Sequence, residues 1–441
     1  MTKIAFIGAG SYGFTHRLLA DILTYEALRD SELAFMDVDA ERLEAVQTIA
    51  STYLKSQGLG QQPLITTDQR QALDGADFVF NLVKIGFNTM SFMDLDVPKK
   101  YGLKQTIGDT CGVGGVFRGL RTMPFCIELC KDVKEVSAAG AVVLNYTNPQ
   151  SMLVMATAAT SKVPFIGLCH SVQGTSNQVA DYLEVPYHEL EFEAAGINHM
   201  SWITRLEHMG EDLYPRLREL VQERGIYGHK PAEDDPVRPF LGPSRLDMLQ
   251  RCGYVVTESS THFPEYVPFY ARTDELIERY QIPIDQHKRN MENKEKNLKG
   301  LLEQVQQGHL PPLERSVEYG PAIINAMLTG EPLTVYANVM NQDLVTNLPA
   351  NACVEVACLV DRNGVQPCRF GALPTQLAAL CHMDISVHQL AVEAILERDR
   401  RRVYWALMMD PLTHACLTLD QIEALVDELV ERQQEYLGRY L

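Results

Sequence analysis

The 441-residue chain lacks any uninterrupted apolar stretch close to the roughly 20 residues that a membrane-spanning helix requires. It also lacks the charged segment, apolar core and small-residue cleavage site of a signal peptide, because residues 3–8 begin a strand-like run almost at once. We therefore expect neither a membrane protein nor a secreted one.

Basic residues are scarce relative to acidic ones. The chain has 39 lysines and arginines against 57 aspartates and glutamates, which gives a formal net charge of −18. Nucleic acids and anionic membranes bind to a concentrated basic face. The composition therefore argues against both partners and leaves a small molecule as the expected one.

Disulfide-framework spacing is absent as well. Ten cysteines are scattered along the chain without a regular pattern. This distribution is typical of reduced thiols in the cytoplasm, where most cysteines act as small buried hydrophobes. The predicted location is therefore the cytoplasm.

Alternating strands and helices make up the first part of the chain. Strand-like runs separated by helical stretches predict an α/β fold with a doubly wound, Rossmann-like parallel sheet. A chain of 441 residues is long for one core, so we expect two packed domains, 1–190 and 191–441. The predicted strands are residues 3–8, 33–37, 64–67, 78–83, 142–146 and 165–168.

A glycine-rich turn follows the first strand and opens a helix. Gly8, Gly10, Ser11 and Gly13 permit a tight turn and close approach to a pyrophosphate, which the free amides of the helix N-terminus stabilise. Asp37 ends the second strand, where a carboxylate binds a ribose hydroxyl and favours NAD over NADP. The alternative for Asp37 is a cap of the next helix. The complete unit favours dinucleotide binding.

Ligands of such sheets collect beyond the carboxyl ends of the strands. By this rule Lys84, Asn148 and Cys169, which follow three different strands, are candidate site residues. Cys169 and the distant His199 are also a soft and a borderline metal ligand. Their spacing matches no metal motif, and a buried thiol with a core histidine is the alternative.

A glycine-rich stretch, 107–121, lies between the fourth and fifth strands and runs into a helix. It carries Asp109, Arg118 and Arg121 among five glycines. Such a loop allows the backbone to approach a ligand closely, so we favour a substrate or cofactor loop over a plain surface connection.

A second structural region begins after about residue 190, with a loop-rich span at 225–243. A charged helix at 285–307 is interpreted as solvated, and later helices are predicted to cover a second sheet in an α+β domain. The predicted strands are 200–206, 333–341 and 353–360, and the predicted later helices are 374–381, 387–409 and 419–436.

The motifs taken together resemble glycoside hydrolase family 4, the NAD-dependent glycosidases, along nearly the whole chain. Within the family the chain is most similar to the bacterial α-galactosidase (melibiase) branch. The segments that carry the resemblance are residues 8–11, 145–149, 167–175, 196–200, 347–349 and 353–360.

The resemblance implies a lactate/malate dehydrogenase-like architecture and a redox-elimination cycle. NAD⁺ takes hydride from C3 of the sugar, a base removes the C2 proton, the leaving group departs, water adds, and the hydride returns. A divalent metal, usually manganese (Mn²⁺), chelates the C2 and C3 oxygens. Members of the family are homodimers or homotetramers, so we expect the same here.

Several roles follow from the resemblance alone. Cys169 and His199 match the metal ligands, and Asn148 matches a position that contacts the sugar. Tyr266 matches the proposed C2 base, with a tyrosine that packs by its ring as the alternative. Asp109 matches an acidic loop position that assists proton transfer, with a loop-capping turn as the alternative.

Two departures bear on the substrate. His170 stands where phosphosugar-specific members have an aspartate, and it can serve as leaving-group acid or bind substrate. Lys84 stands where those members have an arginine. A neutral α-galactoside is therefore favoured, and the choice depends on the pocket around Lys84, Arg118, Arg121 and His170.

Three alternatives stay open at this point. An α-galacturonidase or α-glucuronidase of the same family is the nearest. A true NAD-dependent dehydrogenase shares the nucleotide-binding architecture but needs no cysteine ligand to a metal. A non-catalytic NAD sensor is the most remote, since it has no use for Cys169, His199 and Tyr266 together.

Overall fold

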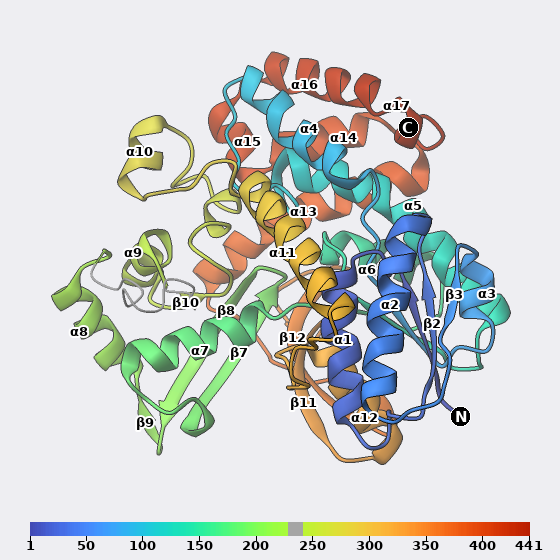
Figure 1. Cartoon of the computed structure of the whole chain (residues 1–441). Helices are drawn as coiled ribbons and strands as arrows, with labels where there is room; N and C mark the ends of the chain where they lie inside the picture. Colours follow the sequence, from blue (N-terminus) through green and yellow to red (C-terminus); the bar gives the residue numbers. More distant parts are fainter. Residues whose placement is uncertain (228–240) are drawn as a thin grey trace.

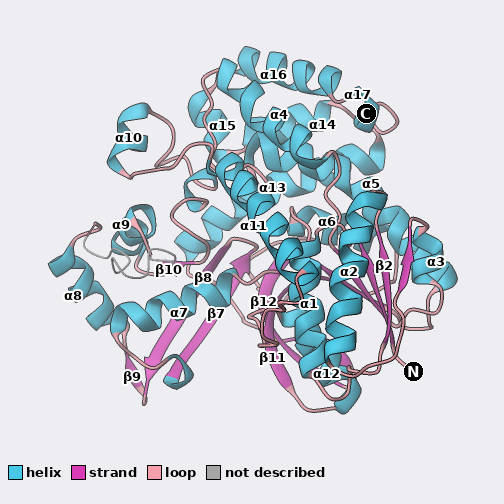
Figure 2. Ribbon diagram, in the orientation of Figure 1, coloured by secondary structure: helices cyan, strands magenta, loops and turns pink. Residues whose placement is uncertain are grey.

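The computed structural model describes residues 1–227 and 241–441, and only the backbone of Tyr12. Helices lie on both sides of one mixed sheet, as Figures 1 and 2 show. The loop predicted at 225–243 falls largely outside the described residues. Within the described part of the chain, no helix is long and apolar enough to cross a membrane.

Strands and helices alternate through the first 183 residues, apart from two successive helices after the fourth strand, and the order becomes more irregular afterwards. The strands are β1 (Lys3–Ile7), β2 (Glu32–Met36), β3 (Leu64–Thr66), β4 (Phe78–Asn81), β5 (Val142–Asn145), β6 (Phe165–Leu168), β7 (Leu190–Ile197), β8 (Met200–His208), β9 (Glu211–Asp212), β10 (Val255–Val256), β11 (Leu333–Met340), β12 (Cys353–Asp361) and β13 (Gly364–Pro367).

The helices, in chain order, are α1 (Tyr12–Thr24), α2 (Ala40–Ser56), α3 (Gln69–Leu73), α4 (Phe87–Lys100), α5 (Gly112–Val136), α6 (Gln150–Thr160), α7 (Ser171–Leu183), α8 (Tyr214–Arg224), α9 (Pro243–Cys252), α10 (Asp274–Arg279), α11 (Gln286–Gln306), α12 (Tyr319–Thr329), α13 (Thr375–Glu397), α14 (Arg401–Met409), α15 (Pro411–Cys416), α16 (Leu419–Arg432) and α17 (Gln434–Leu437). Two short 3₁₀ turns, Tyr187–Glu189 and Phe263–Glu265, complete the described elements.

The first six strands form a parallel sheet in the order β3-β2-β1-β4-β5-β6. Most of their side chains are buried, and a sheet covered on both faces requires such apolar strands. The strand order reverses between β1 and β4, and ligands of this fold bind at that switch point. The predicted Rossmann-like sheet is confirmed.

The second region does not form a sheet of its own, so that prediction is wrong. β11 pairs antiparallel with β6, and β12, β7, β8 and β10 continue the same sheet beyond it. β7, which the sequence did not predict, forms a hairpin with β8. This continuity brings the turn between β7 and β8 to the carboxyl end of β6, where Cys169 follows the strand.

The C-terminal helices differ from the prediction in their breaks. α13 is one helix across the interruption predicted at 382–386 and ends instead at Glu397, where the next residue, Arg398, adopts a left-handed conformation with φ of 55°. Apolar spacing continues on both sides of this residue, so periodicity alone did not reveal the break. α13 packs against α5 and α6, in the upper half of the view in Figure 1.

A buried histidine in α13 gives a testable pH dependence. His388 is buried, neither ring nitrogen has a hydrogen-bond partner among the described residues, and burial lowers its pKa from 6.5 to about 4. The unfolded chain therefore binds more protons than the folded chain between these values, and stability falls as the pH drops. We expect a loss of about 3 kcal/mol between pH 7 and pH 4 from this residue.

The measurement compares urea unfolding of the wild type and His388→Leu at pH 7, 5.5 and 4. The stability of the wild type relative to the variant should decrease steadily across this series. A constant difference would show that His388 is not held in its neutral form.

Candidate active site

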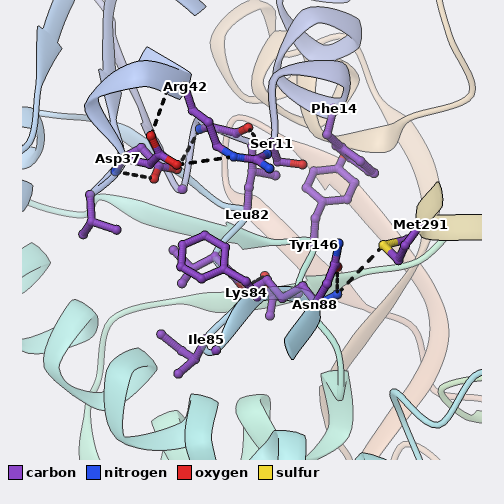
Figure 3. Close-up of a pocket in the computed structure, with 18 of the residues that line it drawn as sticks. Ser11, Phe14, Asp37, Arg42, Leu82, Lys84, Ile85, Asn88, Tyr146 and Met291 are labelled. Atoms are coloured by element: carbon purple, nitrogen blue, oxygen red, sulfur yellow. Dashed lines mark hydrogen bonds and ion pairs between the residues drawn. The ribbon is translucent and has the colours of Figure 1, made fainter. Parts of the chain in front are cut away.

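A cavity of about 760 Å³ opens at the switch point of the sheet (Figure 3). Its volume lies within the range of small-molecule and cofactor sites. Gly8, Gly10, Ser11 and Asp37 line it, as the sequence predicted for a cofactor site. The cavity therefore coincides with the predicted nucleotide-binding unit.

The glycines of this turn are required by contacts within the protein. Gly8 has φ of 84°, and a Cβ on it would lie 2.7 Å from the backbone nitrogen of Val83. A Cβ on Gly10 would lie 2.6 Å from a carboxylate oxygen of Asp37. Gly13 does not line the cavity; a Cβ there would lie 2.3 Å from Leu298, so this glycine makes room for α11.

Asp37 is oriented by backbone groups. Its carboxylate accepts hydrogen bonds from the amides of Gly10, at 2.7 Å, and Asp39, at 3.0 Å. The cap of α2 is Asp39, whose side chain accepts from the amide of Arg42. The alternative role of Asp37 as a helix cap is therefore excluded, and its carboxylate stays at the cavity wall.

Helix α11 is not simply solvated, so that interpretation is wrong for one of its faces. Met291, Lys294, Glu295 and Leu298 line the cavity, and α11 contacts both α1 and α2. Arg42 of α2 pairs with Glu295 at 3.1 Å. The high content of charged residues concealed this role, because charged residues suit a solvated surface and a polar ligand equally.

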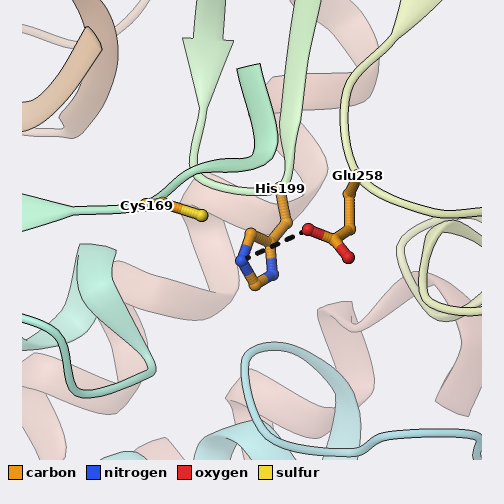
Figure 4. Close-up of side chains that lie close together, drawn as sticks. All are labelled: Cys169, His199 and Glu258. Atoms are coloured by element: carbon orange, nitrogen blue, oxygen red, sulfur yellow. Dashed lines mark ion pairs between the residues drawn. The ribbon is translucent and has the colours of Figure 1, made fainter. Parts of the chain in front are cut away.

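Three metal-binding side chains meet beyond the carboxyl edge of β6. Ligand atoms of Cys169, His199 and Glu258 all lie within 4.8 Å of one another (Figure 4). Cys169 follows β6, His199 lies in the turn between β7 and β8, and Glu258 follows β10. A thiolate, an imidazole and a carboxylate together suit a divalent transition metal. The predicted pair is therefore brought together, with one residue that the prediction missed.

The metal-binding cluster is connected to the cavity through two residues. Asp109 lines the cavity and lies 3.5 Å from His262. His262 in turn lies 3.7 Å from Glu258. A ligand in the cavity that reaches Asp109 is therefore close to the cluster.

Tyr266 is fully buried, and its hydroxyl lies 3.0 Å from Nδ1 of His199. Burial, followed by the nearby Cys111 and Asp109, raises the pKa of Tyr266 well above its usual value. The alternative of a tyrosine that packs by its ring alone does not account for this contact, because the buried hydroxyl is held against a candidate metal ligand. Such outer partners fix the orientation of a metal-binding histidine. The role of Tyr266 as a base stays a prediction.

His170 lies at the N-terminal end of α7, with its Nδ1 3.8 Å from a carboxylate oxygen of Glu318. The nearby carboxylate of Glu318 raises the pKa of His170 to about 9. The imidazole is therefore protonated at neutral pH and able to donate a proton. Its side chain is 57% exposed, so a substrate can reach it.

Asp109 is held as a carboxylate. Burial raises its pKa, but Arg118 and nearby histidines more than offset this, and the pKa lies well below its ordinary value. Arg118 contacts the carboxylate at 3.3 Å, and the amide nitrogen of Asn148 lies 3.4 Å away. The same carboxylate accepts a hydrogen bond from the hydroxyl of Thr110. Asp109 thus orients both Arg118 and Asn148.

Arg121 is not placed to bind a substrate, which corrects the sequence-based assignment. Its guanidinium is fully buried and binds both carboxylate oxygens of Asp94, at 3.1 and 2.6 Å, with Gln433 as a further partner. Asp94 of α4 holds the guanidinium inside the protein, and Arg121 is not among the residues that line the cavity. Arg118, one helical turn earlier, is the arginine that lines the cavity.

The predicted glycine-rich loop is short, because α5 already begins at Gly112. A Cβ on Gly114 would lie 2.3 Å from the carbonyl oxygen of Gly108, and one on Gly115 would lie 2.3 Å from the carbonyl carbon of Thr110. These two glycines let the first turn of α5 pack on the loop before it. Their function is close packing rather than flexibility.

Lys84 lines the cavity beside His287, which the sequence did not single out. The ammonium lies 2.9 Å from the side-chain oxygen of Asn88 and 3.5 Å from Nε2 of His287. Burial, followed by the charge of Arg118, lowers the pKa of Lys84 to about 7. Lys84 can therefore lose or gain a proton near neutral pH.

Comparisons with known proteins extend over the whole chain. The sequence model described as "Family 4 glycosyl hydrolase" matches residues 3–185, and the one described as "Family 4 glycosyl hydrolase C-terminal domain" matches residues 194–413. The chain is 38% identical to an alpha-galactosidase of Bacillus subtilis (strain 168) over 443 residues, which is all of both chains.

Two further proteins are similar to the chain. An alpha-galactosidase of Rhizobium meliloti (strain 1021) is 33% identical, with 99% of this chain and 89% of that protein covered. A crystal structure of a 6-phospho-alpha-glucosidase from gut microorganisms in complex with NAD and Mn²⁺ has a TM-score of 0.84 and 20% identity, with 99% of this chain and 98% of that chain covered. On the sequence matches, the chain belongs to family 4 of the glycosyl hydrolases.

Proposed function

We propose that the chain hydrolyses α-galactosides with bound NAD⁺ and a divalent metal, Mn²⁺ being the first candidate. The observation that carries the proposal is the meeting of Cys169, His199 and Glu258 beside the cavity that Asp37 lines. A dehydrogenase or a nucleotide sensor does not need the metal-binding cluster. The two α-galactosidases named above support the choice of substrate.

The residues of the cavity fit NAD. The glycine turn leaves the N-terminus of α1 open to a pyrophosphate, and the oriented carboxylate of Asp37 is suited to two ribose hydroxyls. The solved 6-phospho-alpha-glucosidase with a similar fold contains NAD and Mn²⁺. When bound, NAD⁺ supplies the hydride acceptor for oxidation at C3 of the sugar.

The cluster fits the metal. Burial raises the pKa of the Cys169 thiol to about 12, so a cation must displace its proton on binding. The hydroxyl of Tyr266 lies within hydrogen-bond distance of Nδ1 of His199 and so restrains the imidazole ring. When bound, the metal supplies positive charge that stabilises the enolate formed at C2 and C3.

The remaining side chains orient the sugar and move protons. The protonated imidazole of His170 is suited to donate its proton to the leaving group. Asp109 lines the cavity and contacts both Arg118 and Asn148, and the amide of Asn148 is suited to bind a sugar hydroxyl there. Tyr266, beside His199, is the candidate base for the C2 proton.

Cofactor choice gives a prediction at Asp37. Asp37→Ala removes two possible hydrogen bonds to the ribose hydroxyls and a carboxylate that repels a 2′-phosphate. We expect NAD⁺ to bind about 10- to 100-fold more weakly and the preference over NADP⁺ to shrink. Calorimetric titration with both dinucleotides measures this. Equal affinities before and after the substitution would contradict the assignment.

The substrate is tested by a direct comparison. The protein is assayed with 4-nitrophenyl α-galactoside and with the matching α-galacturonide, each with NAD⁺, Mn²⁺ and a thiol. We expect the galactoside to have the higher kcat/KM. A higher value for the galacturonide would keep the family mechanism and replace the substrate. Turnover that needs neither NAD⁺ nor metal would overturn the mechanism itself.

We further propose that the chain assembles into a homodimer or homotetramer and that it is located in the cytoplasm. Leu396, Trp405 and Met409 expose about two-fifths of their surface on neighbouring helices α13 and α14, which supports a subunit contact. The ten free cysteines support a reducing compartment. Light scattering on the purified protein measures the mass, and a monomer would contradict the proposed assembly.

A further inference from the structure

We propose that Glu258 is a third protein ligand of the catalytic metal, beside Cys169 and His199. This inference rests on the proposed function and adds a ligand to the two that the family resemblance implies. A carboxylate oxygen of Glu258 lies 3.6 Å from Nε2 of His199. Figure 4 shows the imidazole of His199 between the thiol of Cys169 and the carboxylate of Glu258, and the three ligand atoms lie within 4.8 Å of one another.

The distances suit one shared cation. Oxygen and nitrogen ligands bind divalent metals at about 2.0–2.2 Å, so two neighbouring ligand atoms on one ion lie about 3 Å apart or slightly more. The three donor atoms lie within 4.8 Å of one another, and the 3.6 Å contact is already near that separation. Small side-chain movements are sufficient to place all three on one ion.

The backbone holds Glu258 at the cluster. Thr257, the preceding residue, donates its amide hydrogen to the carbonyl of Ser201, and its hydroxyl accepts from the amide of Ser201. Glu258 itself has φ of 70° and His199 has φ of 64°. Left-handed conformations are costly for side chains of this kind and concentrate at functional sites. Two facing residues therefore share an uncommon conformation that directs both side chains to one point.

Outer partners restrain both side chains. Nδ1 of His262 lies 3.7 Å from the second carboxylate oxygen of Glu258, and the hydroxyl of Tyr266 lies 3.0 Å from Nδ1 of His199. His262 is buried, and its Nε2 has no hydrogen-bond partner among the described residues. Metal ligands are commonly fixed by such outer contacts. The arrangement is therefore that of two ligands with partners, rather than of a solvated surface glutamate.

A third ligand changes the charge of the site. A thiolate and a carboxylate together neutralise a divalent cation, and a hard oxygen ligand favours Mn²⁺ more than a thiolate and an imidazole alone do. Three protein ligands still leave positions of an octahedral ion open for two sugar oxygens and a water. Glu258 thus contributes to metal retention without closing the site to substrate.

The test measures metal binding in the absence of any substrate. Full-length protein with NAD⁺ is titrated with Mn²⁺, and free Mn²⁺ is followed by electron paramagnetic resonance. Loss of an outer partner weakens metal binding by about 10- to 100-fold, so loss of a direct ligand in Glu258→Gln is expected to cost about 100-fold or more. Glu258→Asp, which keeps the carboxylate, is expected to lie between the wild type and the amide.

Cobalt reports the ligand set directly. The visible spectrum of bound Co²⁺ is expected to change shape in Glu258→Gln, while the thiolate-to-metal absorption from Cys169 remains. Glu318→Gln is the matched control, because it removes a carboxylate next to His170 and outside the cluster. We expect it to alter Mn²⁺ affinity by no more than about threefold.

The outcomes separate this inference from the proposed function. An unchanged Co²⁺ spectrum in Glu258→Gln, or an Mn²⁺ affinity within about tenfold of wild type, would overturn the ligand assignment alone. Unchanged Mn²⁺ binding in Cys169→Ser as well would overturn the metal site and with it the proposed function. NAD⁺ titration checks that each variant is folded, and Glu258→Asp decides the question if the amide variant does not fold.

Discussion

Cys169→Ser is expected to reduce kcat/KM for an α-galactoside by at least about 1000-fold. The thiolate is the softest ligand of the cluster, and a serine hydroxyl is a poor replacement because it stays protonated. Loss of the metal removes the charge that stabilises the enolate, which is worth several kcal/mol. The rate is measured with saturating NAD⁺ and increasing Mn²⁺.

A matched cysteine controls for nonspecific effects. Cys368→Ser changes an exposed thiol far along the chain from the cluster and is expected to keep full activity. NAD⁺ affinity should be nearly the same in both variants, since the cavity lining does not include Cys169. Full activity in Cys169→Ser would show that this residue does not bind the metal.

Arg121→Met is expected to destabilise the protein by about 3–5 kcal/mol, the largest stability effect that we predict. The substitution leaves the carboxylate of Asp94 buried and without its cation, and burial already raises the pKa of that group. An uncompensated buried charge costs far more than the ion pair contributes. Urea unfolding followed by circular dichroism measures the loss.

A double substitution identifies the cause of this loss. Asp94→Leu combined with Arg121→Met removes both charges and is expected to recover most of the stability. If the single variant unfolds at the same urea concentration as the wild type, the buried ion pair is not structural. Arg121 would then become available again as a substrate-binding candidate.

The features of the fold that depend on residues close in sequence could be predicted. The apolar runs that became β1, β2, β4, β5 and β6 are buried on both faces, so their composition identifies them without tertiary information. The turn at Gly8 and Gly10 was predictable because it joins a strand directly to a helix. Strand ends then indicated Lys84 and Cys169, since parallel strands place their carboxyl ends at one edge.

Contacts distant in sequence were not predictable. The pairing of β11 with β6 joins segments about 170 residues apart, and periodicity carries no information about partners. For the same reason Arg121 was assigned to the substrate, although its partner Asp94 lies on another helix. The charged pattern of α11 similarly did not show which face covers the cavity.

The role of Glu258 was predictable only in part. It belongs to a segment, 255–266, that is dense in ionisable groups, and this density was visible in the sequence. Which of its side chains meets Cys169 and His199 depends on the pairing of β10 with β8 and on the left-handed conformation of Glu258. Neither feature has a sequence signature when the residue is not glycine.

Hydrolysis in heavy water tests the central claim most directly. An α-galactoside is turned over with NAD⁺ and Mn²⁺ in D₂O, and the released galactose is examined by mass spectrometry and proton magnetic resonance. If a base on the protein removes the C2 proton during the reaction, deuterium appears at C2 of the product. Galactose released at the normal rate with hydrogen retained at C2 would contradict the proposed redox-elimination mechanism.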